Sequence, residues 1–114
     1  MAKKINLNDY LGHSMDCTCG KEHKTNLKIV DIDKDAVSRL PKHIEALGYK
    51  KPFLVADVNT WAAAGALVAE KLDVAGISYK KYIFNEKELI PDEKTLGSLM
   101  MAFSRDCDVI VAVG

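Results

Sequence analysis

The chain has 114 residues, of which 48% are hydrophobic and 28% charged, a composition typical of one globular domain. Its 16 basic and 16 acidic side chains give a formal net charge of +0, which shows no sign of the basic surface of a nucleic-acid-binding protein. No apolar run approaches the roughly 18 residues of a membrane span, and the N-terminus lacks the apolar core of a signal peptide. The 3 cysteines cannot all pair, which agrees with a reducing compartment. We therefore expect a cytoplasmic protein with no nucleic-acid or membrane partner.

The N-terminal part of the chain, residues 1–26, has no sustained hydrophobic periodicity and is expected to form an arm or short hairpin packed on the domain. The next segment, Leu27–Ile32, alternates apolar and polar side chains, which predicts a strand with one half-exposed face. A helical pattern follows, but Pro41 interrupts it, because the residue before a proline is pushed out of the α region. Since proline fits the first position of a helix, we expect a helix over Pro41–Leu47 that ends at Gly48.

From residue 52 onward, strands and helices alternate. Three predicted strands are rich in apolar residues: Pro52–Asp57, Tyr79–Phe84 and Asp108–Val113. Apart from the terminal Asp57 and Asp108, the first and last are apolar, as in strands buried on both faces. Between the strands we expect a helix over Thr60–Ala75, capped by Asn59, and a helix opened by Pro91 and Asp92. This β-α-β-α-β order predicts an α/β fold, a Rossmann-like three-layer domain with a mainly parallel sheet and right-handed crossovers.

The last predicted helix carries an amphipathic stripe of apolar residues at helical spacing: Leu96, Leu99, Met100 and Phe103. Such a stripe is typical of a helix that packs on a core. Methionine fills irregular gaps in cores, so we expect the pair Met100 and Met101 to do so here.

The loops after the strands are the expected site, because ligands of open parallel sheets bind beyond the carboxyl ends of the strands. Asp57 could accept hydrogen bonds from a ribose diol or cap the next helix, and its position alone leaves both roles open. Gly114 would let the backbone approach a pyrophosphate. Neither GxGxxG nor GxxxxGK followed by Ser or Thr occurs, so the phosphates of a dinucleotide would be held elsewhere, most naturally by a loop beyond Gly114.

The remaining candidate residues favour structural roles. Glu86, Glu88 and Asp92 form an acidic loop that we expect to be exposed to solvent, although a carboxylate there could also contact a ribose. Trp61 is expected to pack near a helix start, and His43 to lie at the surface or boundary of a helix. No HExxH, GxSxG or paired-carboxylate motif occurs, so no catalytic residue is assigned.

The cluster Cys17-x-Cys19-Gly20-x-x-His23 contains soft metal ligands. Zinc prefers four ligands and only three are local, although Cys107 or His13 could complete a site. Because Cys-x-Cys is not the usual Cys-x-x-Cys spacing, we favour free thiols in a turn over a metal site.

Several segments resemble one family. They are Asp16–His23 with its CxCGxxH pattern, Leu47–Thr60 with its Asp-x-Asn-Thr ending, Ile90–Glu93 and Asp108–Gly114. These segments resemble bacterial glycerol-1-phosphate dehydrogenases, within the iron-alcohol-dehydrogenase and dehydroquinate-synthase superfamily. The resemblance spans nearly the whole chain, and the CxCGxxH arm is its most specific part.

The resemblance implies a protein larger than this chain. It implies an arm over residues 1–26 and a dinucleotide-binding domain over residues 27–114, incomplete at its phosphate loop, with a helical C-terminal domain beyond. Such enzymes interconvert dihydroxyacetone phosphate and sn-glycerol 1-phosphate with NADH or NADPH. A divalent metal (nickel, zinc or iron) is held by Asp and His residues of the C-terminal domain, so no metal ligand is carried over to this chain.

The resemblance also implies which residues bind the cofactor, namely Asp57, Asn59, Thr60 and Gly114. The chain alone is expected to be inactive. It is expected to self-associate through the apolar face that a C-terminal domain would cover, or to belong to a homo-oligomer.

Two other functions remain open. One is another superfamily member, such as a glycerol dehydrogenase or a dehydroquinate-synthase-like protein, against which the CxCGxxH arm argues. The other is a non-enzymatic, flavodoxin-like binding module, which would be a monomer.

Overall fold

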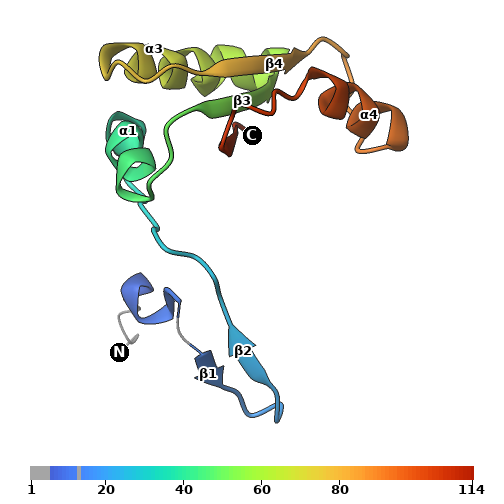
Figure 1. Cartoon of the computed structure of the whole chain (residues 1–114). Helices are drawn as coiled ribbons and strands as arrows, with labels where there is room; N and C mark the ends of the chain where they lie inside the picture. The colour runs from blue at the N-terminus through green and yellow to red at the C-terminus, as the bar shows by residue number, and fades with distance from the viewer. Residues whose placement is uncertain (1–5, 13) are drawn as a thin grey trace. The chain divides into compact units, whose positions relative to one another are not determined.

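The computed structural model describes residues 6–12 and 14–114. The chain forms two compact units, Met1–Lys34 and Asp35–Gly114, coloured along the chain from blue to red in Figure 1. The predicted division into residues 1–26 and 27–114 remains a prediction. No helix in the described part of the chain combines the length and the apolar character that crossing a membrane requires.

The first unit contains a short 3-10 helix, η1 (Leu7–Tyr10), and a hairpin of two strands, β1 (Ser14–Asp16) and β2 (Glu22–Lys24). The strands are antiparallel, with Ser14 opposite Lys24, so of the two expected forms, an arm or a hairpin, residues 14–24 adopt the hairpin. No side chain described between residues 6 and 34 is buried. The first unit therefore has little hydrophobic core of its own.

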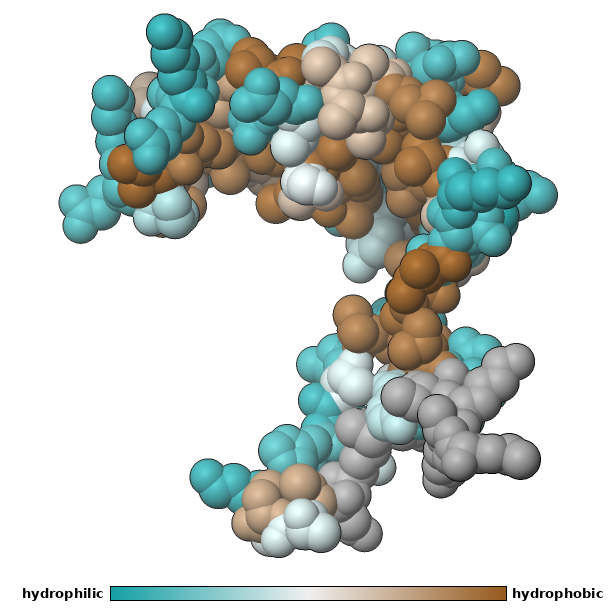
Figure 2. Space-filling view, turned by 180° about the vertical axis from the view of Figure 1, so that it is seen from behind, coloured by the Kyte–Doolittle hydropathy of each residue, from teal (hydrophilic) through white to brown (hydrophobic). Residues whose placement is uncertain are grey.

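The strand predicted over Leu27–Ile32 is wrong, because these residues pair with no other strand. Leu27 is 58% exposed and Ile32 is 80% exposed. Figure 2 shows in brown that hydrophobic residues also lie at the surface of the molecule. An alternating pattern describes a pleated, half-buried surface, but a strand forms only against a partner that takes up its backbone hydrogen bonds. The sequence provides the pattern without the partner.

The second unit is built on a three-stranded parallel sheet in the order β4-β3-β5, which confirms the predicted α/β fold with a parallel sheet. Its strands are β3 (Pro52–Asp57), β4 (Lys80–Phe84) and β5 (Val109–Ala112). The central strand β3 is almost entirely buried. The prediction that β5 is buried on both faces is wrong, because Ile110 is 56% exposed. β5 is an edge strand, and its apolar side chains are covered on one face only.

Helices lie on both faces of the sheet (Figure 1). On one face, α1 (Ala36–Ala46) and α3 (Ala66–Val74) enclose the main core: Ile44, Leu54, Val68, Ala69 and Leu72. Neighbouring residues of a strand point to opposite faces, so Phe53 faces the other side. There its ring meets that of Phe103 edge-on, with 5.2 Å between the centroids. The unit therefore has the three layers predicted for a Rossmann-like domain.

Pro41 does not interrupt the first helix, contrary to the prediction. It lies inside α1 and is buried. A proline inside a helix removes one backbone hydrogen bond, but packing of this helix through Ile44 against α3 outweighs that loss. The predicted end of the helix is confirmed, because Gly48 adopts a φ of 84° and the amide of Tyr49 bonds the carbonyl of Ile44 at 3.1 Å.

The helix after β3 is continuous from Val58 to Val74 and consists of α2 (Val58–Thr60), the π-helical segment η2 (Trp61–Gly65) and α3. Its cap is Asp57, not Asn59 as expected. In the π-helical turn the amide of Ala66 reaches the carbonyl of Trp61. A Cβ on Gly65 would lie 2.6 Å from the Trp61 ring, so the glycine lets the indole lie against the helix.

The last helix, α4 (Glu93–Ala102), begins after its cap Asp92, as predicted. Its methionines are not in the core, however, because Met100 is 68% exposed and Met101 is 91% exposed. Burying a stripe needs a second surface to receive it. Among the described residues the three-stranded sheet provides such a surface only near Phe53 and Phe84, and no residue of α4 is fully buried.

Candidate functional site

The carboxyl edge of the parallel sheet is the candidate site. From β3 the chain passes to β4 on one side and then to β5 on the other. In open α/β sheets the crevice at such a switch point receives the ligand. The pairing of β3 with β5 ends with Val55 opposite Ala112, and the amide of Val113 donates to the carbonyl of Val55 at 2.9 Å. Asp57 and Gly114 each follow two residues later, so the register places both at this crevice.

Asp57 is fixed by the helix that it caps. Its Oδ1 accepts hydrogen bonds from the amides of Asn59 and Thr60, both at 2.8 Å. In return, the amide of Asp57 donates to Oγ1 of Thr60 at 2.9 Å, which completes a capping box. Of the two roles that the sequence leaves open, capping is therefore observed. Among the described residues no hydrogen bond reaches Oδ2, which leaves one carboxylate oxygen for a ligand.

The other three predicted cofactor residues differ in what they can offer. The amides of Asn59 and Thr60 are engaged by Asp57, so neither is free to hold a phosphate. The Thr60 side chain is half-buried in the capping box, whereas the Asn59 side chain is exposed. Gly114 is exposed, and a Cβ placed on it would meet nothing within 4 Å. Asp57, the Asn59 side chain and the Gly114 backbone therefore remain as ligand-facing groups.

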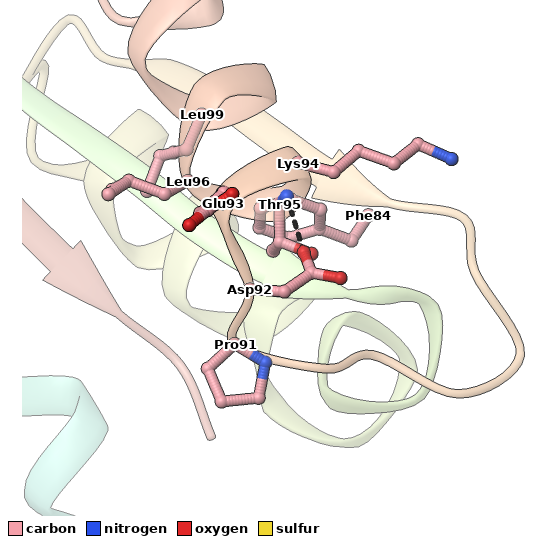
Figure 3. Close-up of a pocket in the computed structure, with 8 residues that line it drawn as sticks. All are labelled: Phe84, Pro91, Asp92, Glu93, Lys94, Thr95, Leu96 and Leu99. Atoms are coloured by element: carbon pink, nitrogen blue, oxygen red, sulfur yellow. Dashed lines mark hydrogen bonds between the residues drawn. The ribbon is translucent and has the colours of Figure 1, made fainter.

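A hollow of about 840 Å³ lies at the same edge, beyond the end of β4 (Figure 3). Phe84 lies at its base and is the register partner of Asp57. The cap of α4 forms one wall, where Asp92 Oδ1 accepts from the Thr95 amide at 2.8 Å. This amide holds the pKa of Asp92 below its ordinary value. Sequence reasoning missed the hollow because it forms between a strand end and a helix start that only the fold brings together.

The other residues at this end of the sheet have structural roles. Trp61 packs against the main core, and the Lys81 ammonium lies 4.6 Å from its ring centroid, which confirms packing. Glu86 and Glu88 are exposed, in agreement with a solvated loop. His43 is half-buried on α1, as expected.

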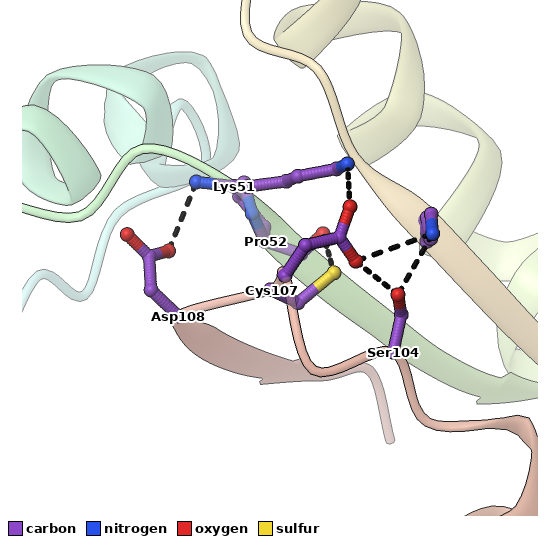
Figure 4. A network of polar contacts seen from close by, with 7 residues as sticks. Lys51, Pro52, Ser104, Cys107 and Asp108 are labelled. Carbon is purple, nitrogen blue, oxygen red and sulfur yellow. Dashed lines mark hydrogen bonds and ion pairs between the residues drawn. The ribbon is translucent and has the colours of Figure 1, made fainter.

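The opposite edge of the sheet is held by a polar network (Figure 4). Asp108 accepts from the amides of Lys50 and Lys51 at 2.8 and 2.9 Å. Asp106 bonds the ammonium groups of Lys51 and Lys80. Both carboxyls have pKa values below the ordinary range, that of Asp106 mainly through Lys51 and that of Asp108 mainly through the Lys50 amide. The network joins the starts of strands and serves stability.

The structure brings the side chains of the predicted cysteine–histidine cluster close together in the first unit. Cys17, Cys19 and His23 are exposed, and their ligand atoms all lie within 4.8 Å of one another. They are the only such group of three or more ligands among the described residues. Cys107 is buried in the second unit, where its thiol contacts the Pro52 carbonyl at 3.7 Å, and His13 lies outside the described residues.

Comparison with known proteins agrees with this architecture. A family model described as iron-containing alcohol dehydrogenase matches residues 31–114. A glycerol-1-phosphate dehydrogenase (NAD(P)+) of Halalkalibacterium halodurans is 35% identical over 103 residues, which cover 87% of this chain and 26% of the relative. The enzyme of that name from Bacillus velezensis is 34% identical over 86 residues, 73% of this chain and 22% of the relative. The glycerol-1-phosphate dehydrogenase (NAD(P)+) of Geobacillus stearothermophilus is 25% identical over 112 residues, which cover 95% of this chain and 28% of the relative.

The chain thus spans about a quarter of the length of these curated relatives. No solved structure matches it. The family match covers both the sheet and the predicted cofactor residues. On this evidence the chain belongs to the iron-containing alcohol dehydrogenase family.

Proposed function

We propose that this chain forms part of the dinucleotide-binding domain of an NAD(P)-dependent, metal-dependent oxidoreductase. The reaction of the whole protein would interconvert dihydroxyacetone phosphate and sn-glycerol 1-phosphate. The observation that supports the proposal is the strand register at the switch point, in which Asp57 and Gly114 each follow the last paired residues of β3 and β5 by two positions. The curated relatives of the chain are named glycerol-1-phosphate dehydrogenases.

The proposed role of Asp57 is to bind a ribose of the dinucleotide. The capping box holds the carboxylate at the carboxyl end of the central strand, since Oδ1 is engaged by two amides. Oδ2 can then accept a hydrogen bond from a ribose hydroxyl. Because the carboxylate is positioned before the ligand arrives, little side-chain entropy is lost on binding.

Gly114 and Asn59 would contribute on either side of this carboxylate. The open space above Gly114 allows a pyrophosphate to approach the backbone closely. The exposed amide side chain of Asn59 can donate or accept a hydrogen bond. Thr60 would act through Asp57, because its hydroxyl and its amide are both committed to the capping box.

Hydride transfer itself would be supplied by the nicotinamide cofactor, and the protein would supply binding and orientation. The carboxyl edge has no cluster of three or more metal ligands among the described residues. We propose that the divalent metal, the substrate phosphate and the catalytic groups of the reaction are bound by the part of the protein that corresponds to the length of the curated relatives not covered by this chain. We also propose that the whole protein is a homo-oligomer.

A chimeric enzyme tests the proposal. Residues 31–114 replace the matching segment of the Halalkalibacterium halodurans relative, and reduction of dihydroxyacetone phosphate is followed through NADH absorbance. We expect activity, with an NADH KM that rises about tenfold in Asp57→Asn, since the asparagine keeps the cap but removes the charge. Glu70→Gln, at an exposed position of α3, serves as the matched control.

Two results would contradict the proposal. One is a folded chimera, shown by its circular dichroism and its metal content, that neither binds NADH nor NADPH. The other is an active chimera in which Asp57→Asn leaves both cofactor KM values unchanged.

A further inference from the structure

Three potential metal ligands meet at the end of the β1–β2 hairpin. Cys17, Cys19 and His23 each offer one ligand atom, and these atoms all lie within 4.8 Å of one another. Cys19 Sγ and His23 Nε2 are 3.1 Å apart. A tetrahedral zinc ion, with bonds of about 2.3 Å to sulfur and about 2.0 Å to nitrogen, separates its ligands by roughly 3.5–3.8 Å. Small side-chain rotations therefore suffice to form such a set.

The turn between the strands creates this arrangement. The Gly20 amide donates to the carbonyl of Cys17 at 3.0 Å, and Gly20 takes a φ of 80°, which a residue with a Cβ adopts only with strain. The chain reverses at this turn and pairs β2 with β1 in antiparallel register. His23, four residues after Cys19, consequently returns to the two thiols.

The surroundings of the three ligands also favour a metal. No side chain described between residues 6 and 34 is buried, and an isolated two-stranded hairpin is at best marginally stable in water. Small units with so little core are commonly held by disulfides or metals. Both cysteines of the cluster are exposed free thiols.

We propose that Cys17 Sγ, Cys19 Sγ and His23 Nε2 bind one zinc ion, with the fourth position taken by water or an external ligand. The ion holds the turn and strand β2 together. Both thiols bind as thiolates and the imidazole binds in its neutral form, so each ion displaces up to two protons. This inference depends on the hairpin geometry and is independent of the proposed dehydrogenase function.

Metal titration of the full 114-residue chain, reduced with a phosphine and freed of metal, tests the proposal. We expect cobalt(II) to bind one to one, with the visible bands of a tetrahedral site and the near-ultraviolet charge-transfer bands of thiolate ligation. Equimolar zinc should then remove these bands. A chain that shows no thiolate charge transfer and binds no zinc would establish free thiols and overturn the proposal.

Variants identify the ligands. In competition with a chromophoric chelator, Cys17→Ser, Cys19→Ser and His23→Gln should each weaken zinc binding by at least about tenfold. His43→Gln and Cys107→Ala, both in the second unit, should leave it unchanged within about twofold. Loss of binding in either control, with the three hairpin variants unaffected, would also overturn the assignment.

Thiol reactivity gives an internal control within one molecule. Zinc should slow the reaction of Cys17 and Cys19 with a disulfide reagent by at least about tenfold, because metal-bound sulfur is a poor nucleophile toward it. Cys107 is buried and should stay slow with and without zinc. Equal rates for Cys17 and Cys19 in both conditions, measured by peptide mapping, would contradict a metal site.

Discussion

Asp57 and Thr60 bond each other in both directions: the Thr60 amide donates to Asp57 Oδ1 at 2.8 Å, and the Asp57 amide donates to Thr60 Oγ1 at 2.9 Å. This pair closes strand β3 and begins the longest helical run of the chain. The residue proposed to bind a ribose is therefore also a residue that stabilises the fold. The two roles can be separated by substitution.

Replacing Asp57 with alanine should destabilise the second unit, whereas asparagine should not. Asp57→Ala removes two hydrogen bonds from amides at the helix start, and loss of such a cap costs about 1 kcal/mol, within a range of roughly 0.5–2 kcal/mol. Asn is as good a cap as Asp. Urea unfolding followed by circular dichroism measures both. Equal destabilisation by the two variants would show that charge, and not the cap, stabilises this corner.

Acid should weaken the network at the amino edge of the sheet. The pKa values of Asp106 and Asp108 are lowered in the folded chain. Their stabilisation is therefore complete above the unfolded value of about 3.9 and is lost progressively as the pH falls from there through the lowered folded-state values. Asp106→Asn and Asp108→Asn should therefore lower the urea midpoint less at pH 3 than at pH 7.

Salt distinguishes the two carboxylates. Asp106 pairs with the ammonium groups of Lys51 and Lys80, and exposed ion pairs are screened by salt. Asp108 accepts from backbone amides instead. At 1 M NaCl the effect of Asp106→Asn should shrink more than that of Asp108→Asn, and the reverse order would contradict this assignment.

Two glycine-to-alanine substitutions should change stability in opposite directions. Gly76 ends α3 with a φ of 73°, and a side chain in this region costs about 1–2 kcal/mol. Gly97 lies within α4, where a Cβ would meet nothing within 4 Å, so alanine should stabilise by up to about 1 kcal/mol. Thermal unfolding should show a lower Tm for Gly76→Ala and a higher one for Gly97→Ala. The same sign for both would contradict the backbone argument.

The exposed stripe of α4 should cause self-association. Leu96, Met100 and Phe103 are 58%, 68% and 38% exposed, and apolar surface that extends along a helix favours association. Light scattering after size-exclusion chromatography should show a concentration-dependent mass that Met100→Lys reduces. The matched variant Met101→Lys, on the same helix outside the stripe and 91% exposed, should leave the mass unchanged. A monomer at every concentration would favour the free-standing module.

Local patterns predicted the elements whose stabilising contacts are near in sequence. Pro52–Asp57 has the apolar run of a buried strand and is one, and Gly48 and Gly76 end their helices as left-handed residues. Where a structure depends on a partner far away in the sequence, the local patterns gave wrong predictions. Leu27–Ile32 alternates but has no neighbouring strand, and Pro41 lies within a helix because packing outweighs one missing hydrogen bond.

The candidate site divides in the same way. The sequence by itself determined that Asp57 and Gly114 follow apolar strands, and that Cys17, Cys19 and His23 are close along the chain. Only the tertiary structure decided that β3 lies between β4 and β5, which brings Asp57 and Gly114 to one crevice. Only the turn at Gly20 brought the ligand atoms of Cys17, Cys19 and His23 within 4.8 Å of one another. The physical reason is that spacing along the chain fixes local geometry, whereas strand order and burial depend on contacts between residues far apart in sequence.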